Sequence, residues 1–145
     1  MKVELPTSIK GGSFEDERGR LSFVNDFDMS PVKRVYFTEH FSEDVIRAWQ
    51  AHKIEQRWFL CVQGGFTIKL VCVDDFDHPC DDLPVHEFSI NENEPQIVHV
   101  PKGYANGIQA TEPNSKLMIF SDYLFGENPD DQVRFDKNMW TTWNS

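Results

Sequence analysis

The stretch Trp58–Val71, WFLCVQGGFTIKLV, decides the fold class of this 145-residue chain. The apolar run Trp58–Val62 is followed by the turn sequence Gln63–Gly65 and then by Phe66–Val71, in which apolar and polar side chains largely alternate. Runs of this length around a glycine turn are typical of β-strands, and a continuous apolar run indicates burial on both faces. We therefore predict a central, largely buried β-hairpin here.

Short segments of the same character recur along the chain. Further strands are predicted at Arg20–Val24, Arg34–Thr38, Gln96–Val100 and Lys116–Ser121, and the two central strands extend over Arg57–Val62 and Phe66–Val73. Glycine, proline and asparagine groups separate them, and no window of helical length keeps a 3.6-residue apolar period. Many short strands of this spacing favour an all-β sandwich or barrel, with the acidic stretch Asp74–Asp82 as an exposed loop.

Length and composition indicate one globular domain spanning residues 1–145. The chain is 39% apolar and 13% aromatic, which is ordinary for a folded protein and far from a disordered one. It has no apolar segment of signal-peptide type and none long enough to span a membrane. The three cysteines form no CxxC pair. We expect a soluble, unexported, cytoplasmic protein.

The charge distribution narrows the choice of ligand. A net charge of −10 argues against nucleic acid, which requires clustered cations. Residues 1–60 carry nine cationic and ten anionic side chains, whereas residues 61–145 carry five and fourteen. The cations of the first part of the chain are therefore the candidates for binding an anionic small molecule. The alternative is that they are solvated charges at strand edges. The candidates there are Arg18, Arg20, Lys33, Arg34, Arg47 and Arg57.

Four parts of the chain together resemble one family of proteins. Asp16–Leu21, DERGRL, is similar to its D-x-R-G-x-L/F opening. Arg47–Lys53, RAWQAHK, resembles the R-G-x-H-A-H-K of nucleotide-sugar ketoisomerases and, more loosely, the R-G-L-H-x-Q of dTDP-4-dehydrorhamnose 3,5-epimerases. Val100–Gly107, VPKGYANG, resembles V-P-x-G-x-A-H-G. Ser121–Tyr123 and Val133–Asp136 are similar to the S-x-Y element and the I-x-W-x-D tail.

This resemblance runs in order over about residues 10–137 and implies a fold and an activity. The implied fold is the cupin jelly-roll β-barrel, and the implied assembly is a homodimer. The implied activity is isomerisation or epimerisation of a nucleotide sugar of the dTDP-4-keto-6-deoxyhexose type, as in deoxysugar biosynthesis. It implies no cofactor.

Three residues match positions that handle protons in the family. The reaction removes a proton next to a ketone, holds the enolate and returns a proton. The resemblance assigns the base to His52, the enolate contact to Arg57 and the proton donor to Tyr123. The alternatives are a hydrogen-bonded strand histidine, a phosphate contact or surface charge, and a core tyrosine, respectively.

Five residues are predicted to bind the substrate. Arg18 and Arg47 match positions that the family uses for the pyrophosphate, which guanidinium groups bind through paired hydrogen bonds. Gln50 and Asn106 stand where the family has histidines, and an amide supplies only hydrogen bonds. Lys53 is the fifth residue predicted to contact the substrate. The aromatic residues offered for ring stacking are Phe14, Tyr36, Phe37, Trp49 and Trp58.

Two other functions stay open. Because Gln50 and Asn106 replace histidines, the chain could be a cupin that binds a nucleotide sugar or carbohydrate without turnover. A metal-dependent cupin is the third possibility. The positions of its usual ligands are Gln50, His52, Gln56 and Asn106, of which only His52 is a good ligand for a transition metal. No metal site is therefore predicted.

Overall fold

The computed structural model describes residues 3–144, and its regular structure there consists of β-strands throughout, which confirms the all-β prediction. The strands are β1 (Thr7–Lys10), β2 (Gly12–Asp16), β3 (Gly19–Phe23), β4 (Arg34–His40), β5 (Ile46–His52), β6 (Arg57–Gln63), β7 (Gly65–Cys72), β8 (His86–Asn91), β9 (Gln96–Val100), β10 (Tyr104–Ala110), β11 (Ser115–Ser121) and β12 (Gln132–Arg134). The described residues include no helix long and apolar enough to cross a membrane.

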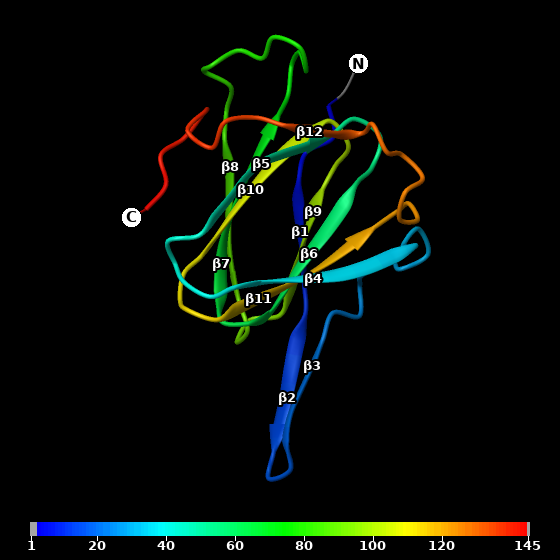
Figure 1. Cartoon of the computed structure of the whole chain (residues 1–145). Helices are drawn as coiled ribbons and strands as arrows, with labels where there is room; N and C mark the ends of the chain where they lie inside the picture. The colour runs from blue at the N-terminus through cyan, green and yellow to red at the C-terminus, as the bar shows by residue number, and fades with distance from the viewer. Residues whose placement is uncertain (1–2, 145) are drawn as a thin grey trace.

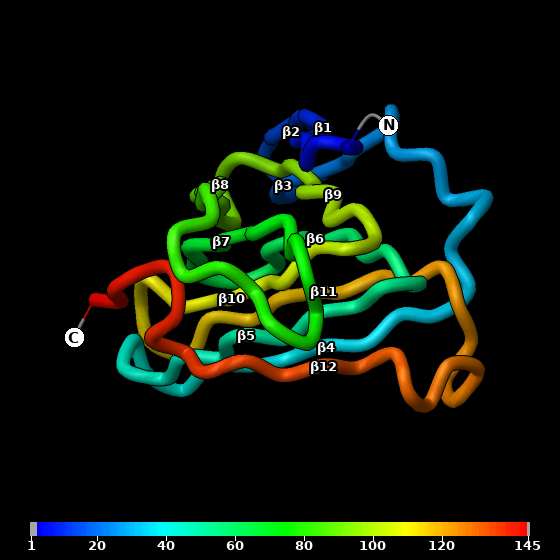
Figure 2. The backbone as a smooth tube through the Cα atoms, turned by 90° about the horizontal axis from the view of Figure 1, so that it is seen from above, coloured from blue at the N-terminus to red at the C-terminus, as the bar shows by residue number. Residues whose placement is uncertain are grey.

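The strands form two five-stranded antiparallel sheets and a separate hairpin. The first sheet has the order β1-β9-β6-β11-β4, and the second has the order β12-β5-β10-β7-β8. Seen from above, the two sheets lie over each other as the layers of a jelly roll (Figure 2). The hairpin β2–β3 extends away from both sheets at one end of the molecule (Figure 1).

The predicted central hairpin is wrong, although both of its strands exist. Strand β6 pairs with β9 and β11, whereas β7 pairs with β8 and β10, so the turn at Gly64 carries the chain from one sheet to the other. The physical reason is that each strand has an apolar face that must be buried. Packing face to face buries both faces in one core, and neighbouring strands of each sheet supply the hydrogen bonds.

The main core lies between the two sheets. It includes Phe59 and Leu117 from the first sheet and Phe66, Ile68 and Leu70 from the second, all nearly or fully buried. Burying one such side chain stabilises the fold by about 1.5–3 kcal/mol. The alternating apolar residues of β7, Phe66, Ile68 and Leu70, therefore all point into this core.

The outer face of the second sheet is covered by the C-terminal segment. Trp49 is buried there against Trp140 and Trp143, with ring centroids 5.1 and 5.8 Å away. The indole nitrogen of Trp49 donates a hydrogen bond to the carbonyl oxygen of Met139 (3.0 Å). This cover leaves the inner face of β5 free to line the space between the sheets.

Six strands lack a clear signal in the sequence: β1, β2, β5, β8, β10 and β12. Strands β1, β8 and β12 lie at sheet edges, and a short edge strand needs no regular apolar pattern. Strands β5 and β10 are central, but a change of register between them interrupts the alternation. The predicted acidic loop Asp74–Asp82 is confirmed as mostly exposed.

Candidate active site

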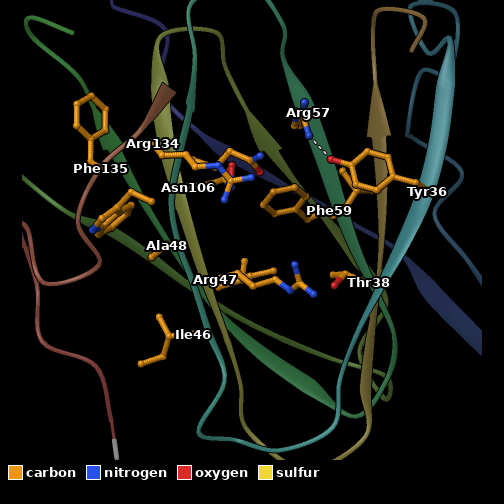
Figure 3. Close-up of a pocket in the computed structure, with 14 residues that line it drawn as sticks. Tyr36, Thr38, Ile46, Arg47, Ala48, Arg57, Phe59, Asn106, Arg134 and Phe135 are labelled. Carbon is orange, nitrogen blue, oxygen red and sulfur yellow. Dashed lines mark hydrogen bonds between the residues drawn. The ribbon is translucent and has the colours of Figure 1, made fainter. Parts of the chain in front are cut away.

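A cavity of about 360 Å³ opens between the two sheets (Figure 3). Residues of six strands and the segment after β12 line it: Tyr36, Thr38, Ile46, Arg47, Ala48, Trp49, Gln50, Arg57, Phe59, Asn106, Ile108, Ile119, Arg134 and Phe135. Of the eight predicted site residues, Arg47, Gln50, Arg57 and Asn106 are on this wall. The structure thus brings together half of the predicted site.

An irregularity in β5 allows two of these residues to face the cavity. Asn106 pairs with Gln50, but Ile108 pairs with Arg47, so Ala48 and Trp49 both lie opposite Gly107. In a regular strand, residues three apart point to opposite faces. The extra residue of this β-bulge restores the inward direction, so Arg47 and Gln50 both line the cavity.

The cavity wall is cationic, although the protein is acidic. Arg47, Arg57 and Arg134 line it, and none of the described residues on the wall is a carboxylate. Within residues 3–144, neither Arg47 nor Arg134 forms an ion pair. Both side chains extend into the space between the sheets in Figure 3. The wall therefore carries two cationic groups that no carboxylate of residues 3–144 pairs with.

Hydrogen bonds connect Arg134 with β5. With its amide oxygen turned toward them, Gln132 accepts hydrogen bonds from Gln50 Nε2 (2.6 Å) and from Arg134 Nη2 (2.7 Å). Since β12 also pairs with β5, the short edge strand holds its arginine over the cavity. Gln50 thus supports a cation, in addition to lining the wall.

Arg57 is held between two side chains. Its Nη2 donates to Glu55 Oε2 at 2.7 Å, and its Nη1 donates to the hydroxyl oxygen of Tyr36, a contact visible in Figure 3. Glu55 and Arg57 are both buried, with 7% of each side chain exposed. Tyr36 comes from β4 and Arg57 from β6, two strands that β11 separates in the first sheet, so this contact crosses the cavity wall.

His52 lies two residues beyond Gln50 on β5, which places its side chain on the same inward face. It is 4% exposed. Its Nδ1 is 3.8 Å from Glu55 Oε2 and 3.8 Å from Asp131 Oδ2. Burial, and then the charge of Arg57, lower the pKa of His52 from 6.5 to about 4, while Asp131 opposes this shift. The imidazole is therefore neutral at physiological pH.

Several buried polar atoms on the cavity wall and beside it have no hydrogen-bond partner within the described part of the chain. Among the described residues, the buried atoms without a hydrogen bond include both ring nitrogens of His52, Arg57 Nε and Asn106 Oδ1. Such atoms cost about 1–3 kcal/mol each, so they are rare in folded proteins and cluster at functional sites. Three predicted site residues share this property.

Four predicted site residues are not among those that line the cavity: His52, described above, and three that lie elsewhere. Tyr123 follows β11 and is half-buried, with Lys33 Nζ 5.8 Å from the centre of its ring. Lys53 is exposed, and its Nζ is 5.1 Å from the ring centre of Phe76. Arg18 lies in the protruding β2–β3 hairpin, where it pairs with Asp16 at 2.6 Å and is 83% exposed.

Sequence reasoning did not assign a role to Arg134 or Glu55, and it offered Tyr36 only for ring stacking. One signal could have found Arg134, because it is the only arginine after Arg57 and lies within the tail motif. Glu55 and Tyr36 carry no such signal. Their importance depends on contacts between strands that are distant in the sequence.

Comparison with known proteins decides the family. Residues 4–140 match the family described as "FdtA: WxcM-like, C-terminal". This chain belongs to that family. A search of curated protein sequences finds no match.

The solved structures similar to this FdtA-family chain share its fold. They include an rmlC epimerase from Mycobacterium tuberculosis, which is 16% identical with a TM-score of 0.77 over 99% of this chain and 76% of the other. A dTDP-4-dehydrorhamnose 3,5-epimerase from Bacillus anthracis with TDP and PPi bound is 15% identical, with a TM-score of 0.76 over 95% and 84% of the chains. The 3,4-ketoisomerase QdtA from Thermoanaerobacterium thermosaccharolyticum, as a mutant in complex with TDP-4-keto-6-deoxyglucose, is 18% identical, with a TM-score of 0.69 over 92% and 90%. The predicted cupin jelly-roll fold is confirmed.

One group of side chains in this FdtA-family chain has the composition of a metal site. His52, Glu55 and Asp131 place one ligand atom each within 4.8 Å of one another. However, both oxygens of Asp131 accept backbone hydrogen bonds, and Glu55 is paired with Arg57. A divalent cation would have to displace these partners beside a guanidinium group, so the residues do not fit a metal.

Proposed function

We propose that this FdtA-family chain isomerises or epimerises a nucleotide-linked 4-keto-6-deoxyhexose by moving a proton next to the ketone. The observation that carries the proposal is the cavity wall: Arg47 and Arg134 form no ion pair there within residues 3–144, and a third wall arginine, Arg57, acts through its charge on the buried, neutral His52. The arginines suit the diphosphate, and the histidine suits the proton transfer. Similar solved structures hold TDP or a TDP-linked sugar, which supports the same class of ligand.

The diphosphate would bind to Arg47 and Arg134. Guanidinium groups bind phosphate oxygens in pairs of charge-assisted hydrogen bonds, and two of them match the two phosphates. Arg18 was predicted for this role together with Arg47, but its hairpin extends away from the cavity of its own chain (Figure 1). Arg134 supplies the second cation within the same chain.

The proton transfers would involve His52, Arg57 and a tyrosine. A neutral imidazole accepts the proton next to the ketone, and Arg57 stabilises the negative charge that develops on the oxygen. Tyr36 is the phenol on the cavity wall, where its hydroxyl contacts Arg57, whereas Tyr123 is not on that wall. We therefore assign proton return to Tyr36 and keep Tyr123 as the comparison. Gln50 and Asn106 would orient the sugar through hydrogen bonds, and Lys53 stays a predicted contact at the rim.

The experiment that tests this proposal is hydrogen exchange at the sugar ring. The protein is incubated with TDP-4-keto-6-deoxyglucose in deuterated water, and the ring protons next to the ketone are followed by NMR. We expect exchange with the wild-type protein, loss of exchange with His52→Ala and Tyr36→Phe, and retention with Tyr123→Phe. Loss of exchange with Tyr123→Phe alone would return the proton donor to Tyr123.

Binding without turnover is the second candidate function. It is favoured by Gln50 and Asn106, whose amides cannot exchange protons as the family's histidines do. The same experiment separates the two functions. Tight binding of the nucleotide sugar with no deuterium at any ring position would support the binding protein and reject the isomerase for this substrate.

We also propose that the chain acts as a homodimer. An apolar groove of about 380 Å³ lies on the outer face of the first sheet, and its lining includes Phe23, Met29 and Val62, all exposed. The hairpin beside it exposes Phe14 and Leu21 as well. Contiguous apolar surface of this kind is typical of an interface. A second copy would cover it and could receive the hairpin that carries Arg18.

We further propose that the chain forms one domain and acts in a reducing compartment. The core is continuous between the two sheets from Phe59 to Ile119, which supports one domain over residues 1–145. All three cysteines are free thiols, which supports a reducing compartment such as the cytoplasm.

A further inference from the structure

The carboxylate of Glu55 lies between two groups of the candidate reaction. It comes from the turn between β5 and β6, where its Oε2 is 2.7 Å from Arg57 Nη2 and 3.8 Å from His52 Nδ1. Only 7% of the Glu55 side chain is exposed, so water does not screen these contacts strongly. One oxygen atom therefore faces both the candidate base and the candidate oxyanion contact.

The neighbouring carboxylate, Asp131, is engaged differently. Its oxygens accept hydrogen bonds from the backbone nitrogens of Lys53, Ile54 and Glu55, at 2.8 to 3.1 Å. Asp131 thus stabilises the turn, and its Oδ2 also lies 3.8 Å from His52 Nδ1. The charge of Glu55 is directed at side chains and not at the backbone, so its burial is not explained by the turn.

Burial of the Glu55–Arg57 pair is costly for a protein that needs only stability. Desolvating two charges costs several kcal/mol, and apolar replacements of a buried ion pair are often as stable or more stable. The pair does, however, fix the guanidinium plane. Nη2 is held by Glu55 and Nη1 by Tyr36, so Arg57 can present its remaining surface to the cavity in one orientation.

We propose that Glu55 is a positioning residue of this site, which orients Arg57 against Tyr36 and stabilises the proton that His52 accepts. This inference rests on the proposed function for its kinetic consequence. Protonation of His52 changes a neutral ring beside a carboxylate into an ion pair with it, which lowers the energy of the protonated base. Glu55 is not among the residues that line the cavity, so it acts through Arg57 and His52.

The test is Glu55→Gln, which keeps the shape of the side chain and removes its charge. We expect kcat for ring-proton exchange to fall about 100-fold while KM changes less than threefold, since orientation and proton affinity are affected and the diphosphate contacts are not. Glu87→Gln is the matched control, because the Glu87 side chain lies on β8 and is 58% exposed. Its ion pair with Lys69 Nζ is long, at 3.9 Å, and is therefore weaker than the buried pair of Glu55. Its kcat should equal that of the wild type.

A double variant separates positioning from a general loss of stability. If Glu55 acts through Arg57 and His52, Glu55→Gln should lower kcat less in the Arg57→Gln background than in the wild type, because the part of its effect that depends on Arg57 is already lost there. A folded Glu55→Gln protein with wild-type kcat, or fully additive losses in the double variant, would overturn the inference. If Glu55→Gln does not fold, Glu55→Asp replaces it. This variant keeps the charge but moves it by one methylene, and an unchanged kcat there would overturn the inference equally.

A second readout does not depend on activity. The pKa of His52, measured by NMR titration of its ring proton, should be lower in Glu55→Gln than in the wild type because a stabilising charge is removed. If the wild-type protein shows no ring-proton exchange, the proposed function fails, but this titration still decides the contact. An unchanged pKa of His52 would overturn the role of Glu55 in either case.

Discussion

At the scale of single residues, His52 links the chemistry of the site to the stability of the fold. Burial and the charge of Arg57 lower its pKa from 6.5 to about 4, so the unfolded chain takes up a proton at a higher pH than the folded protein. The free energy of unfolding must therefore fall as pH decreases through the range 6.5 to 4. From pH 7 to pH 5, this one group should remove about 2 kcal/mol.

The prediction is tested by urea unfolding of the wild type and His52→Gln at pH 7 and pH 5. The wild type should lose about 2 kcal/mol more than the variant between these values, because His40 and His99 titrate in both proteins. Equal pH dependence in the two proteins would show that His52 is not a buried, neutral imidazole.

Arg47 and Arg134 give a second prediction at this scale. Each should contribute a charge-assisted contact to the diphosphate, so Arg47→Gln or Arg134→Gln should weaken TDP binding about 10- to 100-fold in calorimetry. Lys102→Gln is the control, since this exposed cation lies in the turn between β9 and β10. Unchanged affinity in Arg134→Gln would mean that the second phosphate is bound elsewhere.

At the scale of elements, the turn between β5 and β6 depends on a residue from the distant C-terminal part of the chain. Asp131 accepts four hydrogen bonds from three consecutive backbone nitrogens of this turn. It is almost fully buried and precedes β12, which itself pairs with β5. The turn, the base at its start and the guanidinium at its end are thus held by one carboxylate.

Asp131→Asn should consequently destabilise the protein by about 3 kcal/mol. The variant keeps one acceptor oxygen but directs an amide group at a backbone N–H, which leaves a buried donor without a partner. Asp130→Asn is the matched control, because the neighbouring side chain is exposed and should change the free energy of unfolding by less than about 0.5 kcal/mol. Thermal or urea unfolding of both variants measures the difference.

At the scale of the whole molecule, the protruding hairpin and the apolar groove predict assembly. A stable dimer should bury about 1,200–2,000 Å² in total. Leu21 is 66% exposed on the hairpin, and a charge there should oppose burial against a second copy. We expect sedimentation to show a dimer for the wild type and a monomer for Leu21→Glu.

A control for this experiment is available on another part of the surface. Phe125 is 88% exposed in the segment between β11 and β12, where Arg34 lies over its ring, and it is not part of the groove. Phe125→Glu should therefore sediment like the wild type. A monomeric wild type, or dissociation by both substitutions alike, would contradict the proposed interface.

The sequence predicted those parts of the fold in which side chains alternate in a regular way. The apolar runs around Phe59 and Ile68 identified two core strands, because a buried strand needs only local information to be recognised. It did not predict their partners. The turn at Gly64 is compatible with a hairpin. Strand β7 instead joins the other sheet, because this places the apolar faces of β6 and β7 against each other in one core.

The site shows the same division. The motif Arg47–Lys53 and the position of Asn106 predicted substrate contacts on what became β5 and β10. The structure places Arg47, Gln50 and Asn106 around one cavity. By itself the sequence therefore determined the all-β class, the family resemblance and the residue types available for chemistry. The tertiary structure decided that a bulge opposite Gly107 turns Arg47 inward, that Arg134 joins it, and that Glu55 stands between His52 and Arg57. These depend on contacts between distant strands, whose geometry follows from burying both sheets together and not from any local pattern.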